Sequence, residues 1–216
     1  PVDGAISTGA EWLKGELAGD VRRTLETLQQ FGDFATMALI IVVIALLDRE
    51  RIRRTLDWGF AAGIGLLVFN GLKEATSRLR PRFGVGDEET VSAFAFFARA
   101  SEAALTDGRS FAYPSTHTTH AVIAAVFLTA MYPRLRPLAV ALAVTVACSR
   151  VILGAHWASD VLAGLILGYA WARLCVDRYW GVQLVDAVWR VFDRKATPAF
   201  PKTFEREQQA IERTSG

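Results

Sequence analysis

Three short motifs in the sequence contain the residue types that a phosphoryl-transfer site needs. The first extends from Lys73 to Arg80, the second is Pro-Ser-Thr-His at 114–117, and the third occupies 149–160. Lysine and arginine can neutralise a dianionic phosphoryl group, and histidine can act on it as nucleophile or general acid. All three motifs lie beside apolar runs, where charged side chains are costly and usually functional.

In the first motif, Lys73 and Arg80 are separated by two helical turns. Both side chains would project from one face if the helix continues to Leu79 and ends before Pro81. Taken alone, this motif also fits a basic cap at the membrane end of a helix, where such residues are common.

The second motif reads as the start of a helix. Ser115 is a natural N-cap, and the free backbone N–H groups of a helix start bind anions. His117 falls in the first turn, close enough to protonate a leaving oxygen. The alternative is an ordinary cap followed by an exposed histidine. His120 lies one turn further on, and we expect it to face lipid or the core.

In the third motif, His156 and Asp160 are four residues apart and share a helix face. A carboxylate bonded to one ring nitrogen would fix the tautomer and leave the other nitrogen free to attack. Arg150 supplies a rigid fork suited to phosphate oxygens. The alternative is a structural His–Asp pair that joins two helices.

Composition narrows the class of protein. Of the 216 residues, 52% are hydrophobic, and a net charge of +2 is too small to imply a nucleic-acid partner. Cys148 and Cys175 lie in apolar runs without metal-ligand spacing, so we expect both to be small buried hydrophobic residues. We therefore expect no metal and no cofactor.

Five apolar segments follow a more polar start, at 34–47, 58–72, 118–132, 137–153 and 157–176. Their polar ends are the motif residues, which fits spans whose tips line a polar cavity. We predict an all-α integral membrane bundle with about five to six transmembrane helices plus amphipathic interfacial helices. It would form one domain, 1–216, with an amphipathic N-terminal helix (1–30), a transmembrane core (31–178) and a cytoplasmic amphipathic helix and tail (179–216).

Arginine clusters set the expected orientation. They lie at 49–54, 134–136 and 173–178, which five spans would place on a single side. The positive-inside rule makes that side cytoplasmic. All three motifs then meet at the opposite face, next to an expected interfacial helix at 91–105.

These motifs resemble the type 2 phosphatidic acid phosphatase (PAP2) superfamily. Its pattern is Lys, six residues, Arg-Pro; then Pro-Ser-Gly-His; then Ser-Arg, five residues, His, three residues, Asp. The resemblance implies that His156 is a nucleophile forming a phosphohistidine, that His117 is the general acid, and that Asp160 orients His156. It assigns phosphate binding, without a metal, to Lys73, Arg80, Ser115, Thr116 through its backbone N–H, and Arg150.

By this resemblance, the chain would be a lipid phosphatase of a bacterial inner membrane, with its site facing the periplasm or exterior. Candidate substrates are undecaprenyl pyrophosphate, phosphatidylglycerol phosphate, phosphatidic acid and a lipid A phosphate. The alternatives are a lipid phosphotransferase using the same phosphohistidine and a catalytically weakened binding or scaffold protein.

Thr116 is the departure from the family pattern, which has glycine there. Glycine permits positive φ and close backbone approach, whereas threonine is β-branched and resists positive φ. If residue 116 lies in a helical first turn, threonine is tolerated and its N–H still points at the phosphate. If it does not, we expect weak activity.

Overall fold

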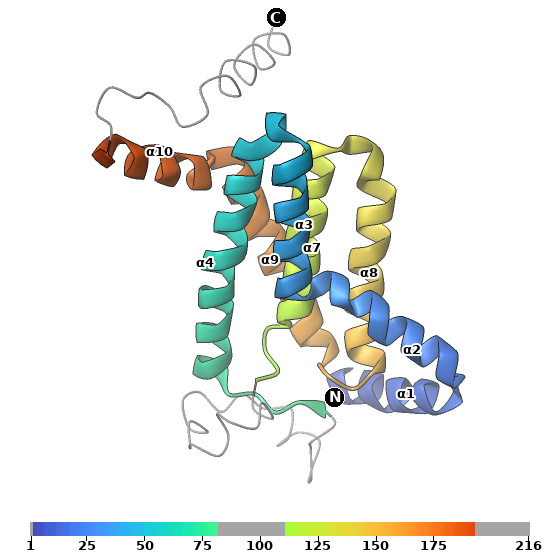
Figure 1. The fold of residues 1–216 in the computed structure, drawn as a ribbon. Coiled ribbons are helices and arrows are strands. Elements are labelled where there is room, and N and C mark those ends of the chain that lie inside the picture. Colours follow the sequence, from blue (N-terminus) through green and yellow to red (C-terminus); the bar gives the residue numbers. More distant parts are fainter. Residues whose placement is uncertain (1, 82–110, 193–216) are drawn as a thin grey trace, which may run out of the picture.

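The structure is a computed structural model that describes residues 2–81 and 111–192. Every regular element within these ranges is a helix, which confirms the all-α prediction (Figure 1). The helices are α1 (Val2–Glu16), α2 (Gly19–Leu28), α3 (Phe34–Leu47), α4 (Ile52–Thr76), α7 (Thr116–Met131), α8 (Arg136–Ile152), α9 (Ala158–Arg178) and α10 (Trp180–Phe192). Short 3-10 turns occur at η1 (Gln29–Gly32), η2 (Arg49–Arg51) and η4 (Pro133–Leu135).

All five predicted apolar segments are helical, as α3, α4, α7, α8 and α9. Three helical stretches are long and apolar enough to cross a membrane: Arg49–Thr76, Pro133–Ile152 and Ala158–Arg178. A fourth candidate is the pair Gly19–Gly32 and Phe34–Leu47, which is bent by 60°. Helix α7 is a shorter apolar helix of 16 residues. These lengths and compositions confirm an integral membrane protein.

Helix α4 begins at Ile52, six residues before the predicted apolar segment. The added turns carry polar residues that are buried against the C-terminal helix α10. Arg53 donates to Asp186 at 3.3 Å, and Asp57 accepts from the backbone N–H of Val182 at 3.0 Å. Hydropathy alone misses these turns because partners from another helix satisfy their polar groups.

Helix α7 lies at the centre of the bundle and packs against α4, α8 and α9. Two glycines of α9 allow a very close approach. A Cβ added to Gly164 would lie 2.8 Å from the carbonyl oxygen of Ser115, and one added to Gly168 would lie 2.8 Å from that of Thr119. Small residues at such positions let membrane helices pack backbone against backbone. This contact holds the second motif against α9, the helix whose first turn contains the end of the third motif.

The two ends of the bundle contain different parts of the sequence (Figure 1). The end of α4, the start of α7 and the α8–α9 junction lie at one end, together with α1 and α2. The turns that contain the arginine clusters lie at the other end, where α10 also packs. The expected meeting of the three motifs at one face is therefore present.

The N-terminal region differs from the single helix predicted over 1–30. It forms two helices, α1 and α2, separated by an extended Ala18 with ψ of 144°. Glycines at 15 and 19 flank this break and lower the local helix propensity. The predicted C-terminal amphipathic helix is present as α10.

The remaining expectations concern the interfacial helix, the C-terminal tail and the two cysteines. The interfacial helix expected at 91–105 lies outside the described residues, and so does the part of the expected C-terminal tail beyond residue 192. Cys175 is buried as predicted, but Cys148 is exposed, so the prediction is wrong for Cys148. Its side chain lines a cavity between α8 and α9, a position that apolar composition alone does not reveal.

Candidate active site

Lys73 projects from the last turn of α4 toward the start of α7. Its Nζ donates a hydrogen bond to Oγ1 of Thr116 at 3.0 Å, and the lysine is 8% exposed. Arg80 and Arg150 both lie close enough to Lys73 to interact with it electrostatically. Three cations from the first and third motifs are therefore gathered in one place, where they would repel one another without an anion.

The route from Lys73 to Arg80 differs from the expected continuous helix. Helix α4 ends at Thr76, and Ser77 adopts a left-handed conformation with φ of 44°. The following segment runs beside residues 111–113, where the backbone N–H of Ala112 donates to the carbonyl of Arg78 at 3.0 Å. Lys73 and Arg80 thus do not share a helix face, and the turn at Ser77 brings Arg80 back toward the site.

The second motif begins α7 as predicted, but its serine hydroxyl does not cap the helix. Ser115 occupies the N-cap position, but its hydroxyl forms a 2.9 Å hydrogen bond with the hydroxyl of Thr118 and makes no capping bond. Thr116 is the first residue of the helix. Its backbone is therefore helical, which threonine accepts, and a first-turn N–H has no partner inside the helix.

The backbone of His117 packs against η1 in the N-terminal region of the chain. A Cβ added to Gly32 would overlap the carbonyl oxygen of His117, so only glycine allows η1 to pack this closely. His117 interacts electrostatically with Arg150 and Lys73, as does His156. Both predicted catalytic histidines therefore face the same cations. His120 is 3% exposed and packs against the ring of Phe34, with ring centroids 5.9 Å apart.

His156 occupies the turn between α8 and α9 and is 2% exposed. Its Nδ1 lies 2.7 Å from the carbonyl oxygen of Ala112 and 3.8 Å from Oδ2 of Asp160. Because a carbonyl oxygen can only accept, Nδ1 carries the proton in this hydrogen bond. Nε2 then holds the lone pair that a nucleophile needs.

Asp160 lies in the first turn of α9 and is fully buried. Its Oδ1 accepts a 2.6 Å hydrogen bond from Arg78, and its Oδ2 accepts a 2.9 Å bond from the backbone N–H of Trp157. The carboxylate therefore fixes the turn that contains His156, and it adds negative charge near the imidazole.

Arg78 is a site residue that the sequence analysis missed. Besides Asp160, its guanidinium donates to Asp3 at 2.7 Å and to the hydroxyl of Ser159 at 2.6 Å. Arg78 is 3% exposed. Burial of a guanidinium is costly unless specific partners satisfy its charge and its hydrogen-bond donors. The available signal was a second arginine next to an apolar run, two residues before Arg80.

The N-terminal helices supply two further contacts. Asp3 of α1 bonds to Arg78 and to Ser159, and Oε1 of Gln29 accepts from Nη1 of Arg150 at 2.6 Å. Although burial raises the pKa of Asp3, the hydrogen bonds from Ser159 and Arg78 outweigh it and lower the pKa below its ordinary value. Asp3 is therefore ionised at neutral pH and pairs with Arg78 as a charge.

Burial lowers the pKa of His156 well below its ordinary value of 6.5, and the positive charges of Arg150, Lys73 and Arg80 lower it further. The hydrogen bond to Ala112 opposes this shift without reversing it. The imidazole is therefore neutral at physiological pH, as attack through Nε2 requires.

We expect this shift to appear in the pH dependence of the protein. If His156 is the nucleophile, the acid limb of kcat/KM reports its deprotonation in the free protein and should lie below the ordinary histidine pKa of about 6.5. Folding stability should fall as the pH drops below about 6.5, because the unfolded chain then gains a proton that folded His156 resists. An acid limb above neutral pH would contradict a neutral His156.

Comparison with known proteins identifies the family. The family model of the PAP2 superfamily matches residues 54–183, which include all three motifs. The chain belongs to the PAP2 superfamily.

Two curated relatives and one solved structure resemble this PAP2 chain. The lipid A 1-phosphatase of Rhizobium etli is 29% identical over 164 residues, covering 68% of this chain and 67% of that protein. The lipid A 1-phosphatase of Rhizobium johnstonii is 33% identical over 108 residues, covering 50% of this chain and 40% of that protein. A transmembrane PAP2-type phosphatidylglycerolphosphate phosphatase from Bacillus subtilis matches with a TM-score of 0.60 and 25% identity, covering 82% of this chain and 84% of that one.

These relatives are lipid phosphatases, so the PAP2 chain is a membrane protein of a lipid phosphatase family. The eight motif residues predicted from the sequence all lie at the end of the bundle where α7 and α9 begin. Lys73, His117 and His156 all interact electrostatically with Arg150, so this end of the bundle concentrates positive charge that suits an anion such as phosphate.

Proposed function

We propose that this PAP2 protein hydrolyses a phosphate ester of a membrane lipid through a phosphohistidine on His156, at the outer face of a bacterial inner membrane. The observation that carries the proposal is the gathering of Lys73, Arg80 and Arg150 near the buried side chain of His156. The arginine clusters at the opposite end of the bundle support the orientation.

In the proposed reaction, Nε2 of His156 forms a bond to phosphorus while the bond between phosphorus and the lipid oxygen breaks. His117, protonated once the phosphate dianion neutralises the cations beside it, gives its proton to that leaving oxygen. Water then attacks the phosphohistidine, loses a proton to His117 and releases inorganic phosphate with His156 restored. The three cations, the hydroxyl of Ser115 and the free N–H of Thr116 hold the phosphoryl oxygens as charge shifts onto them.

The three cations supply the charge neutralisation that a metal ion provides in other phosphatases. Metal independence is therefore part of the proposal. Incubation with EDTA should leave phosphate release unchanged within about twofold, since no step depends on a metal-activated water. Loss of activity in EDTA that a divalent cation restores would contradict the metal-free mechanism.

The two curated relatives make the 1-phosphate of lipid A the first substrate to test, with phosphatidylglycerol phosphate second. The test is a panel on the purified protein in detergent, with released phosphate and product mass as readouts. The panel should also contain phosphatidic acid and undecaprenyl pyrophosphate. We expect removal of the lipid A 1-phosphate at the highest kcat/KM. Phosphate release from none of these lipids would refute the proposed function.

Thr116 provides a separate test of the phosphate cradle. We expect Thr116→Gly to keep or raise activity, because the backbone N–H remains and Lys73, released from the threonine hydroxyl, can turn to the phosphate. The same change should lower the free energy of unfolding by roughly 0.5–1 kcal/mol, through added freedom of the unfolded chain.

Thr116→Val is the matched control, since it keeps the branched shape and removes only the hydroxyl. Equal activity of the two variants and the wild type would show that the hydroxyl is dispensable. If Thr116→Gly and Thr116→Val both stay folded and both lose activity, the hydroxyl acts as a working ligand, and the assigned role of Thr116 is wrong.

A further inference from the structure

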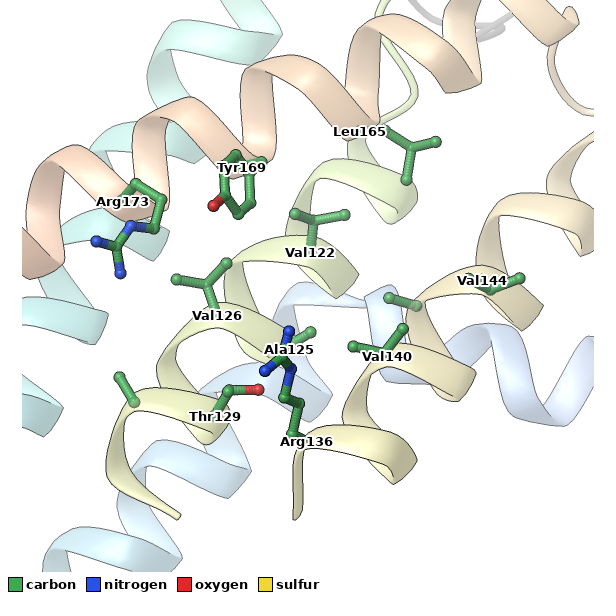
Figure 2. Close-up of a pocket in the computed structure, with 12 residues that line it drawn as sticks. Val122, Ala125, Val126, Thr129, Arg136, Val140, Val144, Leu165, Tyr169 and Arg173 are labelled. Carbon is green, nitrogen blue, oxygen red and sulfur yellow. The ribbon is translucent and has the colours of Figure 1, made fainter. Parts of the chain in front are cut away.

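A cavity of about 440 Å³ lies between α7, α8 and α9 (Figure 2). None of the eight predicted site residues lines it. Its walls are largely aliphatic. They include Val122 and Val126 of α7, Val140 and Val144 of α8, and Leu165 of α9. These residues lie in the apolar parts of the helices, so the cavity faces the hydrocarbon region of the membrane.

Two arginines line this cavity toward the end of the bundle with the arginine clusters. Arg136 is the first residue of α8, and Arg173 lies near the end of α9. Figure 2 shows the side chain of Arg136 extending from the start of α8 toward α7, with Arg173 on the neighbouring helix. The cavity therefore combines an apolar groove with a cationic end.

The two arginines retain hydrogen-bonding capacity for a ligand. Arg173 pairs with Asp177, and both of its contacts, at 2.9 and 3.2 Å, use Nη2. A guanidinium has five N–H donors, so the N–H groups on Nε and Nη1 of Arg173 take no part in this pair. Among the described residues, no carboxylate pairs with Arg136.

The groove continues along α8 beyond this cavity. A second cavity of about 450 Å³ shares Val144 and Leu165 with the first and extends to Ile152 and Ala158. Together the two cavities follow the 17 residues of α8, or about 25 Å of helix. This length accommodates an extended acyl chain whose polar end lies at the arginines.

We propose that this groove binds an anionic phospholipid from the leaflet at the arginine end, with its phosphodiester between Arg136 and Arg173. One acyl chain lies along the valines of α7 and α8. Charge complementarity decides the class of lipid, because two guanidinium groups at the membrane surface favour an anionic head group over a zwitterionic one. The site lies at the opposite end of α8 from Arg150, so it is distinct from the site where substrate phosphate would bind.

The test is native mass spectrometry of the full chain, titrated with phosphatidylglycerol or phosphatidylcholine. Inorganic phosphate in excess occupies the candidate active site throughout. The wild type should bind one phosphatidylglycerol with about thirtyfold higher affinity than phosphatidylcholine, the scale expected for two arginines near a membrane surface. Arg136→Gln combined with Arg173→Gln should abolish this preference. Arg134→Gln combined with Arg190→Gln removes equal charge outside the groove and should preserve it.

A second pair of variants tests the groove itself. Val144→Trp should fill it and remove the bound lipid whatever its head group, whereas Leu67→Trp, at an exposed position of α4, should not. Absence of the wild-type preference, or its survival in the Arg136 and Arg173 double variant, would overturn the proposal. So would a wild-type dimer that Val144→Trp makes monomeric with lipid binding unchanged, because the groove would then be an interface between two copies.

Discussion

His156→Ala is expected to lower phosphate release by at least about four orders of magnitude, the scale seen when a catalytic nucleophile is removed. The change deletes the only group proposed to bond to phosphorus, and no other histidine lies in the turn between α8 and α9. The measurement is phosphate release from the preferred lipid in the panel. Rapid quenching of the wild type should also trap an acid-labile phosphoenzyme that His156→Ala fails to form.

His120→Gln is the matched control for this change. His120 is a second buried histidine, packed on Phe34 rather than in the third motif. If it stays folded, this variant should retain activity within about tenfold, since it removes no group proposed to touch the substrate. Near-wild-type turnover by His156→Ala would eliminate the covalent mechanism.

Asp160→Asn is expected to lower kcat by roughly two to four orders of magnitude in a protein that still folds. Bond formation at Nε2 places positive charge on the ring of His156, and the carboxylate 3.8 Å from Nδ1 stabilises that charge. Asparagine removes the charge. It must also turn an NH2 group toward Arg78 or the N–H of Trp157, both of which are donors. The α9 turn that holds His156 is then poorly fixed.

The measurement is kcat and KM on one lipid, together with the thermal unfolding temperature. A fall in kcat with little change in KM supports a transition-state role, whereas equal loss of stability and activity would support a purely structural one. Arg78→Gln should reproduce much of the kcat defect, since it removes the donor that orients Asp160. Arg51→Gln, which breaks a half-buried pair with Asp48 at the far end of the bundle, should leave kcat unchanged. Wild-type kcat in Asp160→Asn would remove Asp160 from the mechanism.

Several features could be predicted from the sequence because they depend on local patterns. Apolar length and arginine placement predict an all-helical membrane bundle, since the bilayer allows few ways to satisfy a backbone. The alternation of apolar segments and arginine clusters predicts that the three motifs lie at the same end of the bundle. Thr116 lies in the first turn of α7, the position in which threonine is expected to be tolerated. The roles of the motif residues in catalysis remain predictions that the mutants above test.

Other features depend on contacts between segments far apart in the chain. The partner of Nδ1 in His156 is the backbone carbonyl of Ala112, and no residue type marks a carbonyl for such a role. Arg78 meets Asp3 across 75 residues, and Arg150 meets Gln29 across 121. The left-handed turn at Ser77 likewise replaces a helix that the spacing favoured. Sequence patterns report which face of one element is apolar or charged, but these contacts follow from packing between elements, which only the tertiary structure specifies.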